Sequence, residues 1–155
     1  MQLDDPYDLD RFLVAQARDY DRALSELRDG KKKSHWMWYI FPQIEGLGHS
    51  PISIRYSIKS AAEARAYLDH PVLGPRLRQC ATVIRDIVGH SALEILGSPD
   101  DLKLRSSATL FAAVSNESVF EQVLQKYFNG EHDKATLLRL EREKHVENAR
   151  PRSTP

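Results

Sequence analysis

A single aromatic stretch, Ser34 to Gln43 (SHWMWYIFPQ), constrains the fold of this chain more than any other feature. It contains both tryptophans of the 155-residue sequence. Ser34 can cap one or two helical turns, and Pro42 ends them because the residue before a proline disfavours helical backbone. Apolar side chains on such turns point in nearly every direction, so this short element must be buried on several faces. Other elements of the chain therefore have to surround it.

The sequence supplies these surrounding elements as helices. From Asp8 to Asp29, apolar residues recur at steps of three and four, which is the period of an amphipathic helix. Capping boxes open two more helices at Ser60 and Ser91, and Ser98 precedes a proline suited to a first helical turn. Further helices are predicted over residues 71–88 and 118–128 and from residue 133 onward. We predict a mainly α-helical fold with a single compact helical domain of about six to eight helices over residues 8–144.

Two segments do not follow the helical period. Between residues 51 and 59, apolar and polar residues alternate, and this period of two predicts one extended segment. Since one strand cannot form a stable sheet, we expect an arm laid over helices or a minor ladder. After Lys144 the chain becomes charged and ends in RPRSTP, so residues 145–155 are predicted to form a disordered C-terminal tail.

Composition and motifs argue against several functions. The 22 basic and 22 acidic side chains balance, so nucleic acid is disfavoured as a partner. No apolar run approaches the ~20 residues of a membrane-spanning helix, and the start lacks a secretory pattern, which predicts a cytoplasmic protein without membrane association. The histidines lack zinc spacing, and the single cysteine, Cys80, lies on an apolar helix stripe, so we predict no metal. No phosphate loop or dinucleotide fingerprint indicates a cofactor.

The aromatic stretch and the loop that follows it form the candidate site. Gly46 and Gly48 give this loop backbone freedom, and a polar glycine-bearing loop beside a rigid aromatic wall is typical of small-molecule pockets. His35 is the candidate catalytic residue, because histidine titrates near neutral pH and can act as an acid or a base. The candidate ligand-binding residues are aromatic, amide, hydroxyl or basic side chains: Gln16, Trp36, Trp38, Gln43, Ser50, Arg55, Lys103 and Ser107.

These assignments have structural alternatives. Large aromatic side chains more often fill a core than line a site. Gln16 lies on the apolar stripe of the first helix, where a core glutamine bonded to the backbone of a neighbouring loop is favoured over a ligand contact. Lys103 with Ser107 one turn later could hold a phosphate or carboxylate, but serines on a helix face more often permit close helix packing.

Two classes of function follow. We favour a domain that binds a small polar or phosphate-bearing metabolite between the His35–Gln43 stretch and the helix that carries Lys103. Such a protein could be an enzyme, for example a hydrolase or glycosidase of a nucleotide-like ligand with His35 in acid–base work. The alternative is a non-catalytic structural or partner-binding helical module, in which the aromatic residues form a core or a protein-binding surface. The sequence supports both classes.

The aromatic stretch also carries a resemblance to a known family. SHWMWYIFPQ, followed by GLG at residues 46–48, resembles the motif of an uncharacterised bacterial family, the domain of unknown function 1810. The further matching segments are Arg11-Phe12 with Ala15-Gln16, Ala64 with Tyr67-Leu68, Leu73-Gly74 with Arg76-Leu77, and Asp101-Leu102-Lys103-Leu104 with Ser106-Ser107 and Thr109-Leu110-Phe111. The resemblance implies a mainly α-helical single domain. It implies no established activity, so no catalytic residue is transferred from it.

Overall fold

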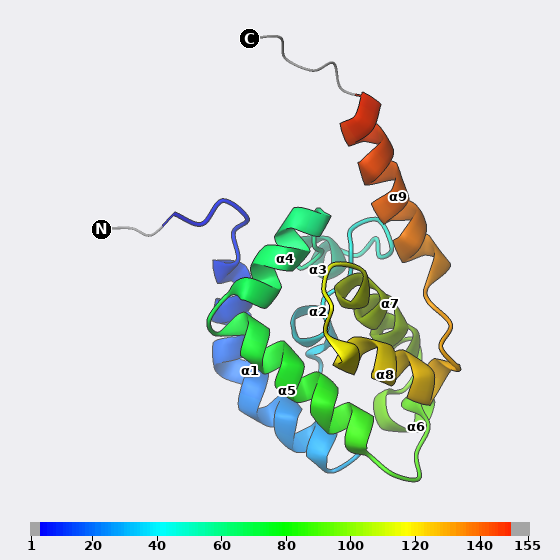
Figure 1. Cartoon of the computed structure of the whole chain (residues 1–155). Coiled ribbons are helices and arrows are strands. Elements are labelled where there is room, and N and C mark those ends of the chain that lie inside the picture. Colours follow the sequence, from blue (N-terminus) through cyan, green and yellow to red (C-terminus); the bar gives the residue numbers. More distant parts are fainter. Residues whose placement is uncertain (1–3, 150–155) are drawn as a thin grey trace.

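Helices make up almost all the regular structure of the chain. In the computed structural model, which describes residues 4–149, there are nine helices, six of them with at least seven residues (Figure 1). Their bounds are α1 (Asp10–Arg28), α2 (Met37–Ile40), α3 (Pro51–Arg55), α4 (Ala61–Asp69), α5 (Leu73–Asp86), α6 (Ala92–Leu96), α7 (Asp100–Ala113), α8 (Ser118–Phe128) and α9 (Lys134–Ala149). The prediction of a mainly α-helical fold is confirmed. No helix in this part of the chain is both long and apolar enough to span a membrane.

The longer helices pack against one another and enclose the short helix α2. α1 lies against α5, and α5 in turn contacts both α4 and α8. α7 packs against α8, α6 and α4, and it also contacts α9. Figure 1 shows α1 and α5 running side by side, with α2 inside the body and α9 leading away from it toward the C-terminus.

The aromatic stretch is buried, as its all-round apolar character predicts. Five of its side chains are each at most 5% exposed: Trp36, Met37, Tyr39, Ile40 and Phe41. The helical part of the stretch is the single turn α2, which packs against α1. The stretch is therefore largely part of the core, with Trp38 partly buried against it and His35 exposed.

The carboxylate of Glu26 on α1 holds the start of the aromatic stretch in place through hydrogen bonds. Glu26 is only 9% exposed. Its Oε1 accepts hydrogen bonds from the amides of Lys33 (2.7 Å) and Ser34 (2.9 Å) and from the indole N–H of Trp36 (2.9 Å). Its Oε2 accepts from the Ser34 hydroxyl at 2.6 Å. Burial by itself would raise the pKa of Glu26, but these hydrogen bonds favour the charged form and lower the pKa to about 2.

The prediction of an extended segment over residues 51–59 is wrong for its first half. Residues Pro51–Arg55 form the helix α3. The Ser50 hydroxyl caps this helix by accepting a hydrogen bond from the Ser53 amide at 3.2 Å, and Pro51 occupies the first turn, where it needs no N–H. The cap and the proline favour a helix over the strand that the alternating pattern predicts. The apolar side of that pattern is not buried here, since Ile54 is 54% exposed.

The second half of the same segment is extended. Ile58 is fully buried and forms an isolated parallel bridge with Ile44. The Ile58 amide donates to the Gln43 carbonyl, and the Glu45 amide donates to the Ile58 carbonyl, both at 2.8 Å. This minor pairing ties the loop after α2 to the chain after α3.

The last helix extends further than the sequence predicts. α9 continues to Ala149, so residues 145–149 are helical although they fall in the predicted tail. Residues 150–155, the remainder of that tail, lie outside the described residues. α9 contacts the body through Arg139, whose Nη2 lies 3.3 Å from Oε1 of Glu45, and through Glu143, which accepts a hydrogen bond from the Ala61 amide at 3.0 Å.

We expect Glu26→Gln to destabilise the protein and to remove part of its pH dependence. Because the pKa of Glu26 is lowered from 4.5 to about 2, the ionised carboxylate stabilises the folded state by roughly 3 kcal/mol above pH ~5. This contribution is lost as the pH falls from about 4.5 toward 2. Urea unfolding across that pH range measures the difference, with the exposed Glu131→Gln as the control. An unchanged pH slope in Glu26→Gln would contradict the assignment.

Candidate ligand-binding cleft

An open cleft of about 360 Å³ lies between the loop after α2 and the first turns of α7. Segments that are distant in the sequence converge on it. Its lining residues are Gln43, Leu47 and Gly48 of the loop, Ser53 of α3, Pro99, Leu102, Lys103 and Ser106 around the start of α7, and Asp133 and Ala135 around the start of α9.

Lys103 is the cation of this cleft, and it contacts the aromatic stretch. Its Nζ lies 5.1 Å from the centroid of the Trp38 ring, within the range of a cation–π interaction. The same Nζ lies 3.3 Å from Oδ1 of Asp100, and 22% of the Lys103 side chain is exposed. Gln43, from the end of the aromatic stretch, lines the same cleft. Three of the residues that the sequence singled out, Trp38, Gln43 and Lys103, are thus brought together.

Close packing of the glycine loop on α3 shapes one wall. A Cβ atom on Gly48 would lie 2.7 Å from the Cβ of Ser53, which is too close for two carbon atoms. Gly46 has a φ of +93°, in the left-handed region that side chains rarely adopt. The loop can therefore approach α3 this closely only because residue 48 is glycine, whereas a Cβ on Gly46 would meet the guanidinium of Arg139 on α9. Beside it, Trp38, Gln43 and Ser53 also border a small recess of about 10 Å³, which is just large enough for one water molecule.

Of the two neighbouring serines on α7, Ser106 lines the cleft and Ser107 does not. Ser107 is 1% exposed and faces the core. Ser106 donates its hydroxyl to the Leu102 carbonyl at 3.2 Å, which leaves its oxygen lone pairs able to accept a further hydrogen bond. Ser106 and Ser107 follow Lys103 by three and four residues, so both are its neighbours on the helix surface. The packing of α7 against the rest of the protein decides which of the two reaches the cleft.

Asp133 also lines the cleft, although the sequence predicts only the start of a helix at this position. Its Oδ2 caps α9 by accepting hydrogen bonds from the amide (3.0 Å) and the hydroxyl (2.5 Å) of Thr136. Its own amide donates to Oγ1 of Thr109 on α7 at 2.9 Å. Its Oδ1 lies 3.9 Å from Nη2 of Arg105. No sequence signal separates this aspartate from other capping aspartates, because its approach to α7 depends on the tertiary fold.

Two other candidate residues, Gln16 and Trp36, lie in the core. Gln16 is 2% exposed, and its side-chain N–H groups donate to the Tyr39 carbonyl at 2.7 Å and to the Tyr67 hydroxyl oxygen at 3.0 Å. This is the arrangement of a core glutamine that holds a neighbouring backbone segment. Trp36 is fully buried, and its indole N–H is taken by Glu26. Neither side chain reaches the cleft.

The remaining candidates are exposed and do not line the cleft. Ser50 caps α3, and its hydroxyl bonds that of Ser53 at 2.8 Å. The guanidinium of Arg55 lies 3.8 Å from a carboxylate oxygen of Asp8 at the surface. His35, the candidate catalytic residue, is exposed, and its contact with the body is made by its backbone carbonyl, which accepts from the Tyr39 hydroxyl at 3.1 Å.

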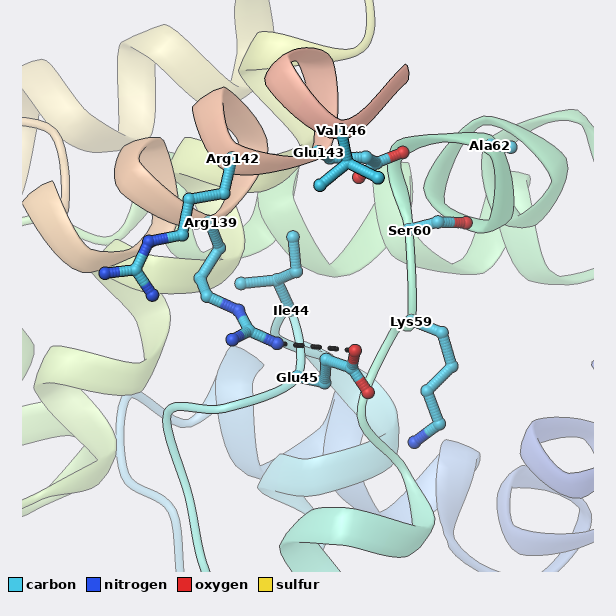
Figure 2. Close-up of a pocket in the computed structure, with 9 residues that line it drawn as sticks. All are labelled: Ile44, Glu45, Lys59, Ser60, Ala62, Arg139, Arg142, Glu143 and Val146. Atoms are coloured by element: carbon cyan, nitrogen blue, oxygen red, sulfur yellow. Dashed lines mark ion pairs between the residues drawn. The ribbon is translucent and has the colours of Figure 1, made fainter. Parts of the chain in front are cut away.

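A second, wider cleft of about 700 Å³ lies between α9 and the segment that leads into α4. Figure 2 shows Arg139 reaching from α9 toward Glu45, whereas Arg142 on the same helix is directed away from Glu45. Glu143 is engaged by the Ala61 amide. Several charged groups here therefore hold α9 to the body, and none of the residues singled out from the sequence lines this cleft.

Neither a metal cluster nor a reactive thiol marks a site in the described part of the chain. Residues 4–149 contain no group of three or more His, Cys, Asp or Glu side chains placed to hold a metal ion. Cys80 is buried, and burial raises the pKa of its thiol to about 12. Such a thiol stays protonated at neutral pH and behaves as a small core residue.

The structure is that of a mainly helical, single compact domain with an open cleft beside the aromatic stretch. The chain matches the model of the family described as "Protein of unknown function (DUF1810)" over residues 6–140, and it belongs to this family. Among solved structures it is similar to the conserved hypothetical protein Rv1873 from Mycobacterium tuberculosis, with 49% sequence identity and a TM-score of 0.88 over 88% of this chain and 99% of that chain. No curated protein matches it. The resemblance carried by the aromatic stretch is thus confirmed.

We expect Trp38 and Lys103 to be energetically coupled. In a double-mutant cycle with Trp38→Leu and Lys103→Met, the coupling free energy should be about 0.5–1 kcal/mol in favour of the wild-type pair, because the ammonium is attracted to the ring face. Urea unfolding of the four proteins measures this term. Pairing Trp38→Leu with Lys144→Met, on the exposed face of α9, is the control and should give additive effects. Additivity in the Lys103 cycle would refute the contact.

Proposed function

We propose that this cleft binds a small polar ligand through an anionic group placed at Lys103. The proposal is carried by Gln43 and Lys103, which line one cleft of about 360 Å³, and by the Trp38 ring, which lies 5.1 Å from Nζ of Lys103. A cation on a rigid helix beside an aromatic ring, with an amide and a hydroxyl to set orientation, is a common composition of small-molecule sites.

The position of Lys103 favours binding because the side chain is already held in place. Its contacts with the Trp38 ring and with Asp100 restrict its rotamers, so less conformational entropy is lost when a ligand anion binds. The Gln43 amide can both donate and accept hydrogen bonds, and Ser106 can accept one. These groups lie in the same cleft and can orient the polar parts of a ligand around its anionic group.

The proposal concerns binding and assigns no catalytic step. The lining residues of the cleft include no histidine or cysteine. A general acid or base must come within hydrogen-bond reach of the reacting group, and His35 is exposed outside the cleft lining. We therefore give His35 no role in the proposed site.

We expect a ligand of this kind to raise the melting temperature of the wild-type protein and to have no effect on Lys103→Gln. A thermal-shift screen should cover nucleotides, nucleotide sugars, sugar phosphates, carboxylates and zwitterionic metabolites. A ligand at a hundred times its dissociation constant adds about 2.7 kcal/mol of stability, which is a shift of a few degrees for a domain of this size.

Two matched variants make this screen specific. Lys144→Gln removes a lysine charge from α9 away from the cleft and should retain the shift. His35→Ala should retain it as well, whereas loss of the shift in this variant would place the site at His35 instead. If no compound shifts the wild type, or if Lys103→Gln responds fully, the proposed site is refuted and the partner-binding module becomes the better explanation.

A further inference from the structure

Lys32 differs from its two neighbours in the basic run, Lys31 and Lys33. Both neighbours are exposed, whereas the side chain of Lys32 is only 9% exposed. Its Nζ lies 3.0 Å from Oδ2 of Asp100 and 5.2 Å from the centroid of the Trp36 ring. Lys32 does not line the cleft at Lys103. It therefore places a positive charge inside the protein, behind the wall of the cleft.

Asp100 is shared by two ammonium groups. Its Oδ2 faces Nζ of Lys32, and its Oδ1 lies 3.3 Å from Nζ of Lys103. One carboxylate cannot neutralise two ammonium groups, so these three side chains together carry one net positive charge. Each of them is at most 22% exposed, and salt screens a charge in such surroundings less than it screens a charge at the surface.

Of these three residues, only Lys103 lines the cleft. With Asp100 alone it would form a neutral pair, and a ligand anion would have to compete with the carboxylate for the ammonium group. Because Lys32 binds the other carboxylate oxygen, the negative charge of Asp100 is divided between two cations. The Lys103 ammonium therefore attracts an anion in the cleft more strongly than it would without Lys32.

The other carboxylates around the start of α7 face Arg105. Oδ1 of Asp133, which lines the cleft, lies 3.9 Å from Nη2 of Arg105. Asp101 precedes Arg105 by four residues and shares its side of α7, whereas it is two residues from Lys103 and does not face it. The carboxylate that governs the charge at Lys103 is therefore that of Asp100.

We infer that Lys32 is a positioning residue of the cleft, which acts on a ligand anion through Asp100 and Lys103. By neutralising Asp100 from inside the protein, it leaves the charge of Lys103 available to the anion. Asp100 has the opposite effect and weakens the attraction. The inference rests on the proposed function and adds the two residues that set the affinity of the cleft for an anion.

Quenching of tryptophan fluorescence by iodide tests this inference without a known ligand. Trp36 is fully buried, whereas Trp38 is partly exposed and lies 5.1 Å from Nζ of Lys103. Iodide therefore reports the local concentration of anions beside Lys103. Acrylamide, which is uncharged, reports the accessibility of the same ring. The ratio of the two Stern–Volmer constants, measured at constant low ionic strength, isolates the electrostatic attraction.

The iodide-to-acrylamide ratio should change in opposite directions in two variants. Asp100→Asn should raise it and Lys32→Met should lower it, each by about twofold, which is the effect of one nearby charge even in water. The double variant Lys32→Met/Asp100→Asn loses one charge of each sign, so its ratio should return close to that of the wild type. A merely structural disturbance would change the acrylamide constant, and the second substitution would not reverse it.

Lys33→Met is the matched control, because it removes a lysine charge from the exposed neighbour of Lys32. It should change the ratio much less than Lys32→Met does. Lys32→Gln, which retains a polar end, takes the place of Lys32→Met if that variant does not fold.

Two results separate this inference from the proposed function. The inference is overturned if the ratio in Lys32→Met equals that of the wild type, or if the double variant is no closer to the wild type than Lys32→Met is. Neither of these results bears on the thermal-shift screen. If the ratios follow the expected pattern but no compound in that screen depends on Lys103, the role of Lys32 stands and the proposed function fails.

Discussion

The hydrogen-bonded carboxylate of Glu26 is the interaction on which the rest of the structure depends. It gathers four donor groups from residues 33–36, and it does so from the last turns of α1. The indole N–H of the fully buried Trp36 would otherwise be desolvated without a partner, at a cost of about 1–3 kcal/mol. Because this contact sets where Trp36 enters the core, it also sets the side on which Trp38 remains half-buried.

A second carboxylate, that of Asp100, links α7 to the segment around the aromatic stretch. Asp100 lies 3.0 Å from Nζ of Lys32 and 3.3 Å from Nζ of Lys103. Each lysine also faces a tryptophan ring, since Nζ of Lys32 is 5.2 Å from Trp36 and that of Lys103 is 5.1 Å from Trp38. These side chains are largely shielded from solvent, so salt screens them less than a surface pair. The contacts that build the core therefore also place the cation of the cleft.

Sequence patterns predicted the helices wherever the deciding signal was local. The capping box at Ser91 forms as expected, with both hydrogen bonds present. At Ser60 only half of it forms, because the Glu63 carboxylate bonds Arg11 at 2.6 Å instead of the cap amide. The prediction fails for residues 51–55 because an alternating pattern indicates a strand only when one face is buried, and burial is a tertiary property.

The sequence identifies residues of the cleft only where the chemistry of a side chain by itself suggests a ligand contact. Gln43 and Lys103 stand out because an amide after an aromatic stretch and a lysine on a small-residue helix suit a ligand, and both line the cleft. Asp133 could not be identified in this way, because capping α9 fully accounts for an aspartate at that position. Its approach to α7 depends on the hydroxyl of Thr109, a contact that no local pattern encodes. The position of Asp133 at the cleft is thus a consequence of how α9 packs on α7.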